Sequence, residues 1–330
     1  MEIKRTICKS NKEWRELRAH SFGASAVGIL LGENHFTTPY QLAVRMRDEL
    51  QGHFDYTQTL PMLRGHAYEQ GVADLFSWQS GIQVIKASSA EYIVQRSDLP
   101  FLHASPDRTY WINPDGLRHG KNAEQNKGLL ECKTTRMPID PDNLPLSWVA
   151  QLQTQMGICG YSEGYIAYDC LSSPDGFGYC RFDFDQDTFD SIVEVVRDFW
   201  QRCIIDGQNP EPVNADDVIR QYPAPIEGKT LTDQGQAQAL IQSILHLKQS
   251  QKEVEDAITQ QSDRLKTLFA DNEAIVDTSG IILATYKQTK PRTTIDTKKL
   301  QADFPEAYTA CAKTGEPSRQ LQLKKPKEMK

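Results

Sequence analysis

The sequence predicts an α/β fold with a mixed central sheet flanked by helices, followed by a helical C-terminal extension. Over residues 1–206, segments alternate in the order helix, strands, helix, strands, helix, which is typical of one α/β domain. Residues 207–230 are rich in Pro, Asp, Asn and Gly and predict a linker. Residues 231–330 open with apolar positions at helical spacing and form the expected extension. The 330 residues suffice for two domains of ~100–200 residues each.

Helix boundaries in the first domain are indicated by capping residues, prolines and glycines. Thr38 followed by Pro39 is a cap with proline at the first helical position, and Pro61 opens a longer helix. Gly81 and Gly160 stand where two of the helices should stop. The expected helical segments are 10–17, 39–46, 61–76, 145–159 and 186–203.

Strand-like segments lie between these helices. They are rich in β-branched and aromatic residues and are bounded by turn signals. Residues 105–126 hold two such signals, Ser-Pro-Asp and Asn-Pro-Asp-Gly, and predict a hairpin with a long polar tip at Arg118–Lys127. The expected strands are 82–85, 91–95, 101–104, 128–133, 164–170 and 179–184.

The extension begins with a helical pattern over 232–269. Two of its ten seam positions are Gln, so we favour a long helix packed on its own domain or on a partner subunit over a free coiled coil. A strand at 281–286 and a short helix at 305–312 follow, and the lysines of residues 324–330 predict a solvated end. The seam positions are Ala237, Leu240, Ile244, Leu247, Gln251, Val254, Ile258, Gln261, Leu265 and Leu268.

Composition and missing signatures exclude several classes of protein. The longest apolar run, Ala26–Leu31, is far shorter than the ~20 residues of a membrane span, and the first residues lack the apolar core of a signal peptide. We therefore expect a cytoplasmic protein that does not enter a membrane. The net charge of −7 argues against coating nucleic acid through bulk charge, but allows a local DNA cleft. Phosphate-loop, dinucleotide, zincin and serine hydrolase motifs do not occur.

Acidic residues on neighbouring strands are the remaining candidates for chemistry. Asp107 follows an apolar strand, and Glu131 and Lys133 lie two residues apart in another, so they share one face of it. Two converging carboxylates would hold a hard cation such as Mg2+, with Mn2+ as the alternative. A lysine beside that ion could orient or deprotonate a water, or stabilise charge on a phosphate. These are the elements of a phosphodiester hydrolase. Asp115 competes with Asp107 as the ligand.

Several short motifs follow one another along residues 14–200. In order, they are Trp14-Arg-Glu-Leu-Arg18 with Ser21-Phe-Gly-Ala-Ser25, Gly65-His-Ala-Tyr-Glu69, the strand after Gly81, Ser105-Pro106-Asp107, Glu131-Cys132-Lys133 and Trp148-Val-Ala-Gln151-Leu-Gln153. Together these motifs resemble the lambda exonuclease and YqaJ-type viral recombinase family of the PD-(D/E)xK nucleases. The resemblance implies a restriction-endonuclease-like core and covers residues 14–200, with a much weaker likeness beyond residue 210.

The resemblance implies specific roles for the residues of the metal site. Asp107, Glu131 and the backbone carbonyl of Cys132 would ligate Mg2+. Lys133 would act on the attacking water. Gln151 would position that water or the lysine, and Gln153, two positions away on the helix, would face elsewhere. Glu69 would lie at the edge of the metal site, as a ligand through water or as a support for the core.

A second group of residues matches positions that hold the 5′-phosphate of a DNA end. They are Arg18, Ser25 and Ser105, and Arg136 is a fourth candidate although its spacing departs from the family pattern. The plain alternatives are a surface role for Arg18 and a helix-capping role for Ser25. His103 lies near these motifs and is expected to pack rather than to catalyse.

The resemblance implies a Mg2+-dependent exonuclease that degrades linear double-stranded DNA from the 5′ end and leaves a 3′ single strand for recombination. It further implies a homo-oligomeric ring around the DNA and a single-strand annealing protein as partner. One alternative is an endonuclease or structure-specific nuclease on the same fold. Another is a DNA-binding scaffold with a dead active site. Strand polarity, oligomeric state, the role of residues 231–330 and phage or chromosomal origin stay open.

Overall fold

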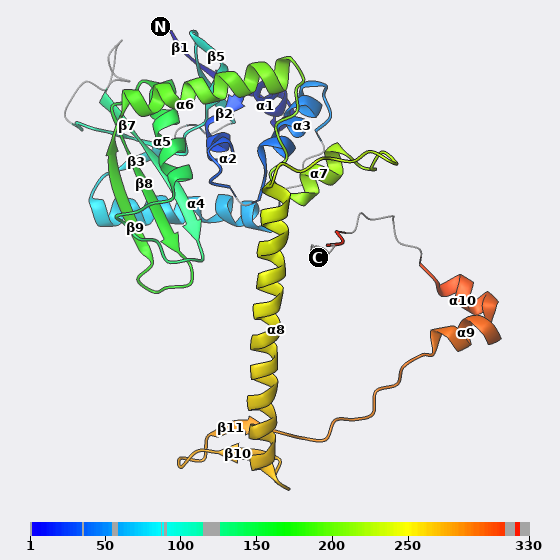
Figure 1. The fold of residues 1–330 in the computed structure, drawn as a ribbon. Coiled ribbons are helices and arrows are strands. Elements are labelled where there is room, and N and C mark those ends of the chain that lie inside the picture. The colour runs from blue at the N-terminus through cyan, green and yellow to red at the C-terminus, as the bar shows by residue number, and fades with distance from the viewer. Residues whose placement is uncertain are drawn as a thin grey trace. The chain divides into compact units, whose positions relative to one another are not determined.

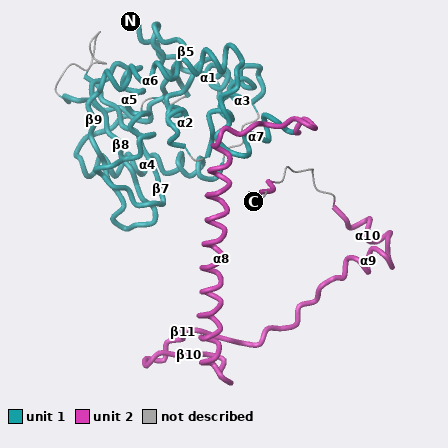
Figure 2. The backbone as a smooth tube through the Cα atoms, in the orientation of Figure 1, with its two compact units in different colours: residues 1–223 teal, residues 224–330 magenta. Residues whose placement is uncertain are grey.

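The computed structural model describes residues 2–34, 36–54, 59–86, 88, 91–114, 126–313 and 321–323. The chain divides into two compact units, Met1–Pro223 and Ala224–Lys330, shown in different colours in Figure 2. Each unit is described by itself. The domain boundaries expected from the sequence, at 206 and 230, stay a prediction. The polar tip at 115–125, which includes Asp115, and the lysines of residues 324–330 lie outside the described residues.

The larger sheet of unit 1 is five-stranded and mixed. Its order is β3-β6-β7-β8-β9, with β7 and β8 parallel and the other neighbours antiparallel. Strand β7 pairs with β8 along seven residue pairs, from Leu129 opposite Gly164 to Thr135 opposite Cys170. The strands are β3 (Val84–Lys86), β6 (Arg108–Trp111), β7 (Lys127–Thr135), β8 (Glu163–Cys170) and β9 (Phe177–Asp183).

Helices α4 (Leu60–Ser80) and α5 (Leu146–Cys159) pack on this sheet, as Figure 1 shows. Alternate residues of β7 enter different apolar clusters. Leu129 is buried with the side chains of α5, whereas Leu130 is buried with those of α4. This period of two places Glu131 and Lys133 on the α5 side of the strand and Cys132 on the α4 side. The predicted α/β fold with helices flanking a mixed sheet is confirmed.

A second, four-stranded sheet lies earlier in the chain, in the order β1-β4-β5-β2. Strand β2 runs parallel to β5, with Gly23 opposite His103. The chain leaves β5 and enters β6 through Ser105–Asp107, so this short connection joins the two sheets. Its strands are β1 (Ile3–Ile7), β2 (Phe22–Gly23), β4 (Tyr92–Arg96) and β5 (Leu99–Ala104).

Capping residues and glycines stand at the ends of the helices of unit 1. Ser10 caps α1 (Asn11–Ala19) through the backbone N–H of Glu13, and Thr38 forms a capping box at α3 (Pro39–Leu50). Gly81 and Gly160 end α4 and α5 in the left-handed conformation. Helix α6 (Gln186–Phe199) continues into the π-helical turn η3 (Trp200–Ile205).

The structure adds elements that the sequence did not reveal. A 3-10 turn η1 (Ala24–Ala26) and a short helix α2 (Val27–Leu30) follow β2. Helix α7 (Ala215–Gln221) lies inside the segment expected to be a linker. The carboxylate of Asp217 fastens it, because that buried side chain accepts a hydrogen bond from the hydroxyl of Thr38 at 2.9 Å.

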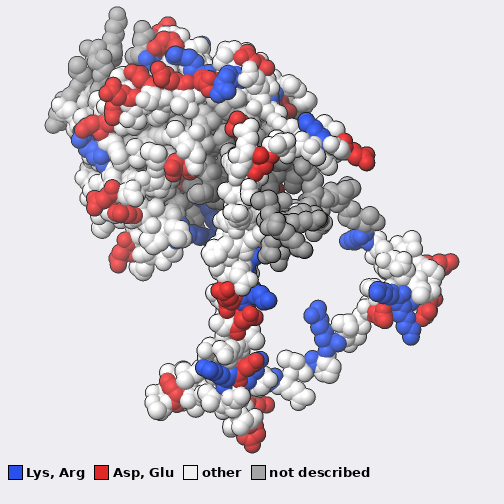
Figure 3. Space-filling model, in the orientation of Figure 1, with Lys and Arg blue, Asp and Glu red and all other residues white. Residues whose placement is uncertain are grey.

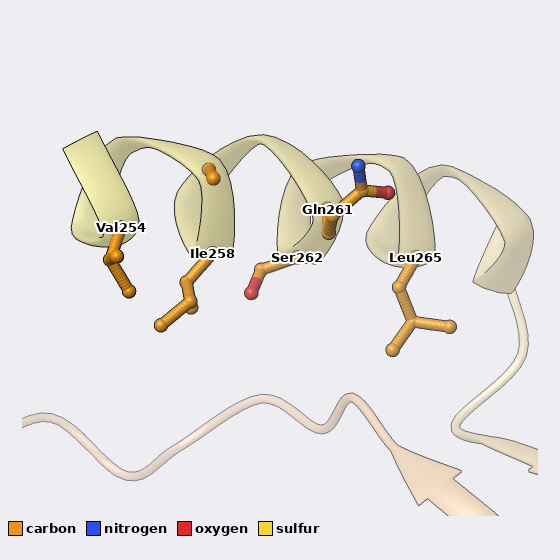
Figure 4. A pocket seen from close by; sticks show the side chains of 6 residues that line it. Val254, Ile258, Gln261, Ser262 and Leu265 are labelled. Atoms are coloured by element: carbon orange, nitrogen blue, oxygen red, sulfur yellow. The ribbon is translucent and has the colours of Figure 1, made fainter.

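Unit 2 is built on the long helix α8 (Gln236–Phe269). It continues with the antiparallel pair β10 (Ala274–Val276) and β11 (Ile282–Thr285), then with α9 (Thr297–Asp303) and α10 (Pro305–Cys311). Val254, Ile258 and Leu265 extend from the same side of α8 (Figure 4). They line a shallow groove with Ala257, Gln261 and Ser262.

The described part of the chain shows no sign of a membrane span. None of its helices combines the length and the apolar composition that crossing a bilayer requires. On the face of unit 1 seen in Figure 3, acidic and basic side chains stand next to one another along the upper edge.

Candidate active site

The first candidate residue, Asp107, stands where β7 extends past its neighbour β6. Pairing of the two strands runs from Trp111 opposite Lys127 to Arg108 opposite Leu130. Asp107 comes directly before β6, and its Oδ2 accepts a hydrogen bond from the backbone N–H of Cys132 at 3.0 Å. The carboxylate therefore caps the edge of β7 at the point where β6 no longer covers it.

Glu131, Lys133 and Gln151 form a closed set of hydrogen bonds on the α5 side of β7. The ammonium of Lys133 donates to Glu131 Oε1 and to Gln151 Oε1, both at 2.8 Å. The amide Nε2 of Gln151 donates to the same Glu131 Oε1 at 2.6 Å. Gln153 is engaged elsewhere: it donates to the carbonyl of Asp183 and accepts from the backbone N–H of Asp185. We call Asp107, Glu131, Lys133 and Gln151 the carboxylate cluster.

One oxygen of this cluster is buried without a partner. Glu131 is 3% exposed, and its Oε2 accepts no hydrogen bond from any described residue. Leaving a charged oxygen in that state costs free energy, so such an atom in a folded protein calls for an explanation, for instance a bound ion. Burial, followed by the charges of Glu131 and Glu69, raises the pKa of Asp107 well above its usual range. A cation between the carboxylates would relieve both penalties.

The donor chemistry fits a hard divalent cation. Carboxylate oxygens of Asp107 and Glu131, with a backbone carbonyl and waters, are the ligands that Mg2+ prefers. Among the described residues, no group of three or more His, Cys, Asp or Glu side chains is placed to hold a metal. The fit therefore rests on the two carboxylates and on the unpartnered Glu131 Oε2.

Sequence reasoning missed Arg108, which connects the cluster to α4. Its side chain is only 4% exposed and forms an ion pair with Glu69. The guanidinium also donates to the backbone carbonyl of Asp107 at 2.8 Å and to Gln70 Oε1 at 3.1 Å. Arg108 thus links Glu69 on α4 to the backbone of Asp107. The signal in the sequence was weak: a single Arg at the start of an apolar strand, with partners 38 and 39 residues earlier.

The candidate phosphate-binding residues gather around β2 and β5. Arg18 donates from Nε to His103 Nε2 at 3.3 Å, and its guanidinium carbon lies 4.3 Å from the centre of the Trp14 ring. Ser25 and Ser105 each follow two residues after the paired residues Gly23 and His103. Because β2 and β5 are parallel, both serines lie at the same end of this strand pair.

The individual surroundings of the remaining candidates differ. Ser25 is exposed within η1, whereas the hydroxyl of Ser105 donates to the carbonyl of Tyr92 at 2.8 Å. Arg136 lies just after β7 and is exposed, and its carbonyl accepts a hydrogen bond from Ser172 at 2.7 Å. Within the described part of the chain, no contact places Arg136 with either group of site residues.

The model of the YqaJ-like viral recombinase domain matches residues 13–162. That range holds Arg18, Asp107, Glu131, Lys133 and Gln151. Over these residues, a little under half of the chain, the protein is similar to that family. The match agrees with the family resemblance drawn from the motifs.

Individual proteins resemble the chain over different lengths. The Bacillus subtilis protein YqaJ, itself described as uncharacterized, is 25% identical over 309 residues, which cover 91% of this chain and 90% of that protein. An alkaline exonuclease from Laribacter hongkongensis, LHK-Exo, is 17% identical with a TM-score of 0.45, over 59% of this chain and 94% of its own. A phage-related exonuclease from Haemophilus somnus is 12% identical with a TM-score of 0.40, over 59% and 99%.

Proposed function

We propose that this YqaJ-like recombinase domain is a metal-dependent DNA exonuclease that degrades linear duplexes from the 5′ end and leaves a 3′ single strand. The observation that carries the proposal is the carboxylate cluster with its buried, unpartnered Glu131 Oε2 beside Asp107. A carboxylate pair next to a lysine is the arrangement that phosphodiester hydrolysis with a divalent cation requires.

Asp107, Glu131 and the carbonyl of Cys132 would hold the ion. The N–H and C=O of a strand residue point to the same side, and the Cys132 N–H already meets Asp107, so its carbonyl faces the same edge. Mg2+, or Mn2+ in its place, would supply Lewis-acid polarisation of the scissile phosphate and neutralise charge. Arg108 would hold the Asp107 connection and Glu69 in place through its hydrogen bonds.

Lys133 would handle the attacking water. An ammonium has three N–H donors, and two of them are engaged by Glu131 and Gln151. The third can donate to the water or to a phosphate oxygen while charge develops in the transition state. Gln151 fixes the lysine by accepting one bond from it and donating another to Glu131. Both contacts restrict the Lys133 ammonium to one position on the α5 side of β7.

The 5′-phosphate would bind Arg18, Ser25 and Ser105, with Arg136 as a further candidate. A guanidinium with hydroxyl donors suits a terminal phosphate, and Ser105 would turn its hydroxyl from the Tyr92 carbonyl to donate to it. Ser105 is two residues before Asp107 in the connection between the sheets, so an end held at Ser105 has its first phosphodiester bonds near the carboxylates. This chain connection supports cutting from the 5′ end.

The assembly and location follow the same proposal. A homo-oligomeric ring would retain DNA without a strongly basic surface, which accords with the net charge of −7. A single-strand annealing protein would receive the 3′ strand, and the cytoplasm is the expected place of action.

The test is digestion of a linear, 5′-phosphorylated duplex labelled at one end, with and without Mg2+. A covalently closed circle, Lys133→Ala and the same-strand control Lys127→Ala run in parallel. Release of 5′ nucleotides from the linear duplex, lost in Lys133→Ala and kept in Lys127→Ala, is the expected result. Cutting of the circle would replace the exonuclease with an endonuclease. No cutting of either DNA would leave a binding scaffold.

A further inference from the structure

A buried histidine holds the arginine proposed to meet the DNA end. His103, on β5, is 3% exposed and is bonded at both ring nitrogens. Its Nε2 accepts from Arg18 Nε at 3.3 Å, and its Nδ1 lies 2.8 Å from the hydroxyl of Ser21. That hydroxyl also accepts from Gln95 Nε2 at 3.2 Å. We call Arg18, Ser21, Gln95 and His103 the histidine cluster.

The partners determine where the ring proton sits. An arginine Nε–H can only donate, so Nε2 of His103 must carry a lone pair and the proton must be on Nδ1. Nδ1–H then donates to Ser21. Burial, followed by the charge of Arg18, lowers the pKa of His103 to about 3, which keeps the ring neutral. The neutral ring accepts from the guanidinium and adds no negative charge at that position.

Trp14 and Gly23 also surround the guanidinium of Arg18. The Trp14 ring on α1 lies 4.3 Å from the guanidinium carbon of Arg18, within range of a cation–π interaction. Gly23 lies opposite His103, and because it has no side chain it leaves space for His103 and Arg18. A Cβ at Gly23 would lie 3.1 Å from His103 Nε2 and 3.5 Å from Arg18 Nη2.

We propose that His103 is a positioning residue that orients Arg18 to recognise a terminal 5′-phosphate; this rests on the function proposed above. With Nε engaged by His103, Arg18 would meet the phosphate through its terminal amines. Ser25 and Ser105 lie two residues past the Gly23–His103 pair, at the same end of β2 and β5. The ring therefore holds Arg18 at the His103 position of β5, two residues before Ser105 and opposite the residue two before Ser25.

The experiment compares equilibrium binding of duplexes with 5′-phosphate and 5′-hydroxyl ends to the full chain without metal. The variants are His103→Phe, which removes the acceptor, His103→Gln, which retains one, and Arg18→Ala. Gln95→Ala is the matched control, because Gln95 contacts Ser21 but not the arginine. The measured quantity is the ratio of the two dissociation constants, since a general loss of structure changes both constants alike.

The expected result is a fall in 5′-phosphate preference of about tenfold or more in His103→Phe and Arg18→Ala, from loss of an oriented charged hydrogen bond. His103→Gln and Gln95→Ala should retain most of the preference. Should His103→Phe fail to fold, Ser21→Ala keeps the ring but removes the group that orients it, and a smaller fall is expected.

Two contrary outcomes are distinguishable. A preference lost in Arg18→Ala but kept in His103→Phe, or kept in full in Ser21→Ala, would overturn the role of His103 alone. A wild-type chain without any preference for 5′-phosphate would overturn that part of the proposed function and the role of His103 with it.

Discussion

The two polar clusters of unit 1 differ in what they leave unsatisfied. In the carboxylate cluster, Lys133 and Gln151 share one oxygen of Glu131, and the other oxygen is buried with no partner among the described residues. In the histidine cluster, both ring nitrogens of His103 and the hydroxyl of Ser21 have partners among the described residues. The first arrangement is suited to receive a cation. The second holds a cation of its own, Arg18, whose guanidinium is bonded to the neutral ring of His103.

Under the proposed function, two distant parts of the sequence would serve one reaction. Both clusters adjoin the connection Ser105–Asp107, which leaves the sheet of His103 and enters the sheet of Glu131. A DNA end bound at one cluster would thus lie close to the other. Four experiments test this division of roles.

The largest effect is expected for Lys133→Ala. Loss of the group that acts on the attacking water should lower the cleavage rate by about 100- to 10,000-fold. The loss should be equal on 5′-phosphorylated and 5′-hydroxyl duplexes, because Lys133 belongs to the carboxylate cluster. Initial rates of nucleotide release measure it, with Lys127→Ala as control. A loss confined to phosphorylated ends would contradict the division.

The next effect concerns stability at low pH. The folded-state pKa of His103, about 3, lies below the unfolded value of about 6.5, so the unfolded chain binds the proton more tightly. The stabilising contribution is complete above pH 6.5 and is lost as the pH falls from 6.5 towards 3, by about 1.4 kcal/mol per unit.

Denaturant unfolding of the wild type and of His103→Gln between pH 7 and pH 4.5 measures this contribution. The free energy of unfolding should fall less steeply in the variant, by about 1.4 kcal/mol per pH unit below 6.5. Equal slopes in the two proteins would show that His103 is not held neutral.

A smaller, paired effect separates two glutamines of α5. Gln153→Ala loses hydrogen bonds to Asp183 and Asp185, so it should lower the free energy of unfolding by about 1–3 kcal/mol with the rate constant of cleavage unchanged. Gln151→Ala should slow cleavage instead, because Lys133 loses its partner. Urea unfolding and cleavage rates on the same preparations give both values. If the two substitutions changed the cleavage rate equally, the proposed role of Gln151 in holding Lys133 would be contradicted.

The sequence predicted the parts of the fold that depend on local chemistry. Thr38, Gly81 and Gly160 marked helix ends because capping and left-handed backbone need particular residues. The alternation in β7 placed Glu131 and Lys133 on one face. Strand β1 was missed because most of its side chains are exposed, so it carries no alternation of buried residues. That the exposed seam of α8 packs on its own domain or on a partner subunit stays a prediction.

The parts of the site that were missed depend on contacts between distant segments. Arg108 has partners on α4, and His103, expected only to pack, has its arginine on α1, 85 residues away. The residue type alone does not predict such a partner, because an arginine in a strand and a histidine near a turn occur in many structures. Only the packing of α1 and α4 against the strands gives them a role.

The most direct measurement is titration of Mg2+ into the wild-type chain by calorimetry, with Glu131→Gln and His103→Gln alongside. We expect binding of Mg2+ in the wild type and in His103→Gln, and loss of binding in Glu131→Gln. At about 100 times the dissociation constant, Mg2+ should also raise the wild-type free energy of unfolding by about 2.7 kcal/mol. Equal binding by Glu131→Gln and the wild type would contradict the assignment of the unpartnered oxygen to a metal ion.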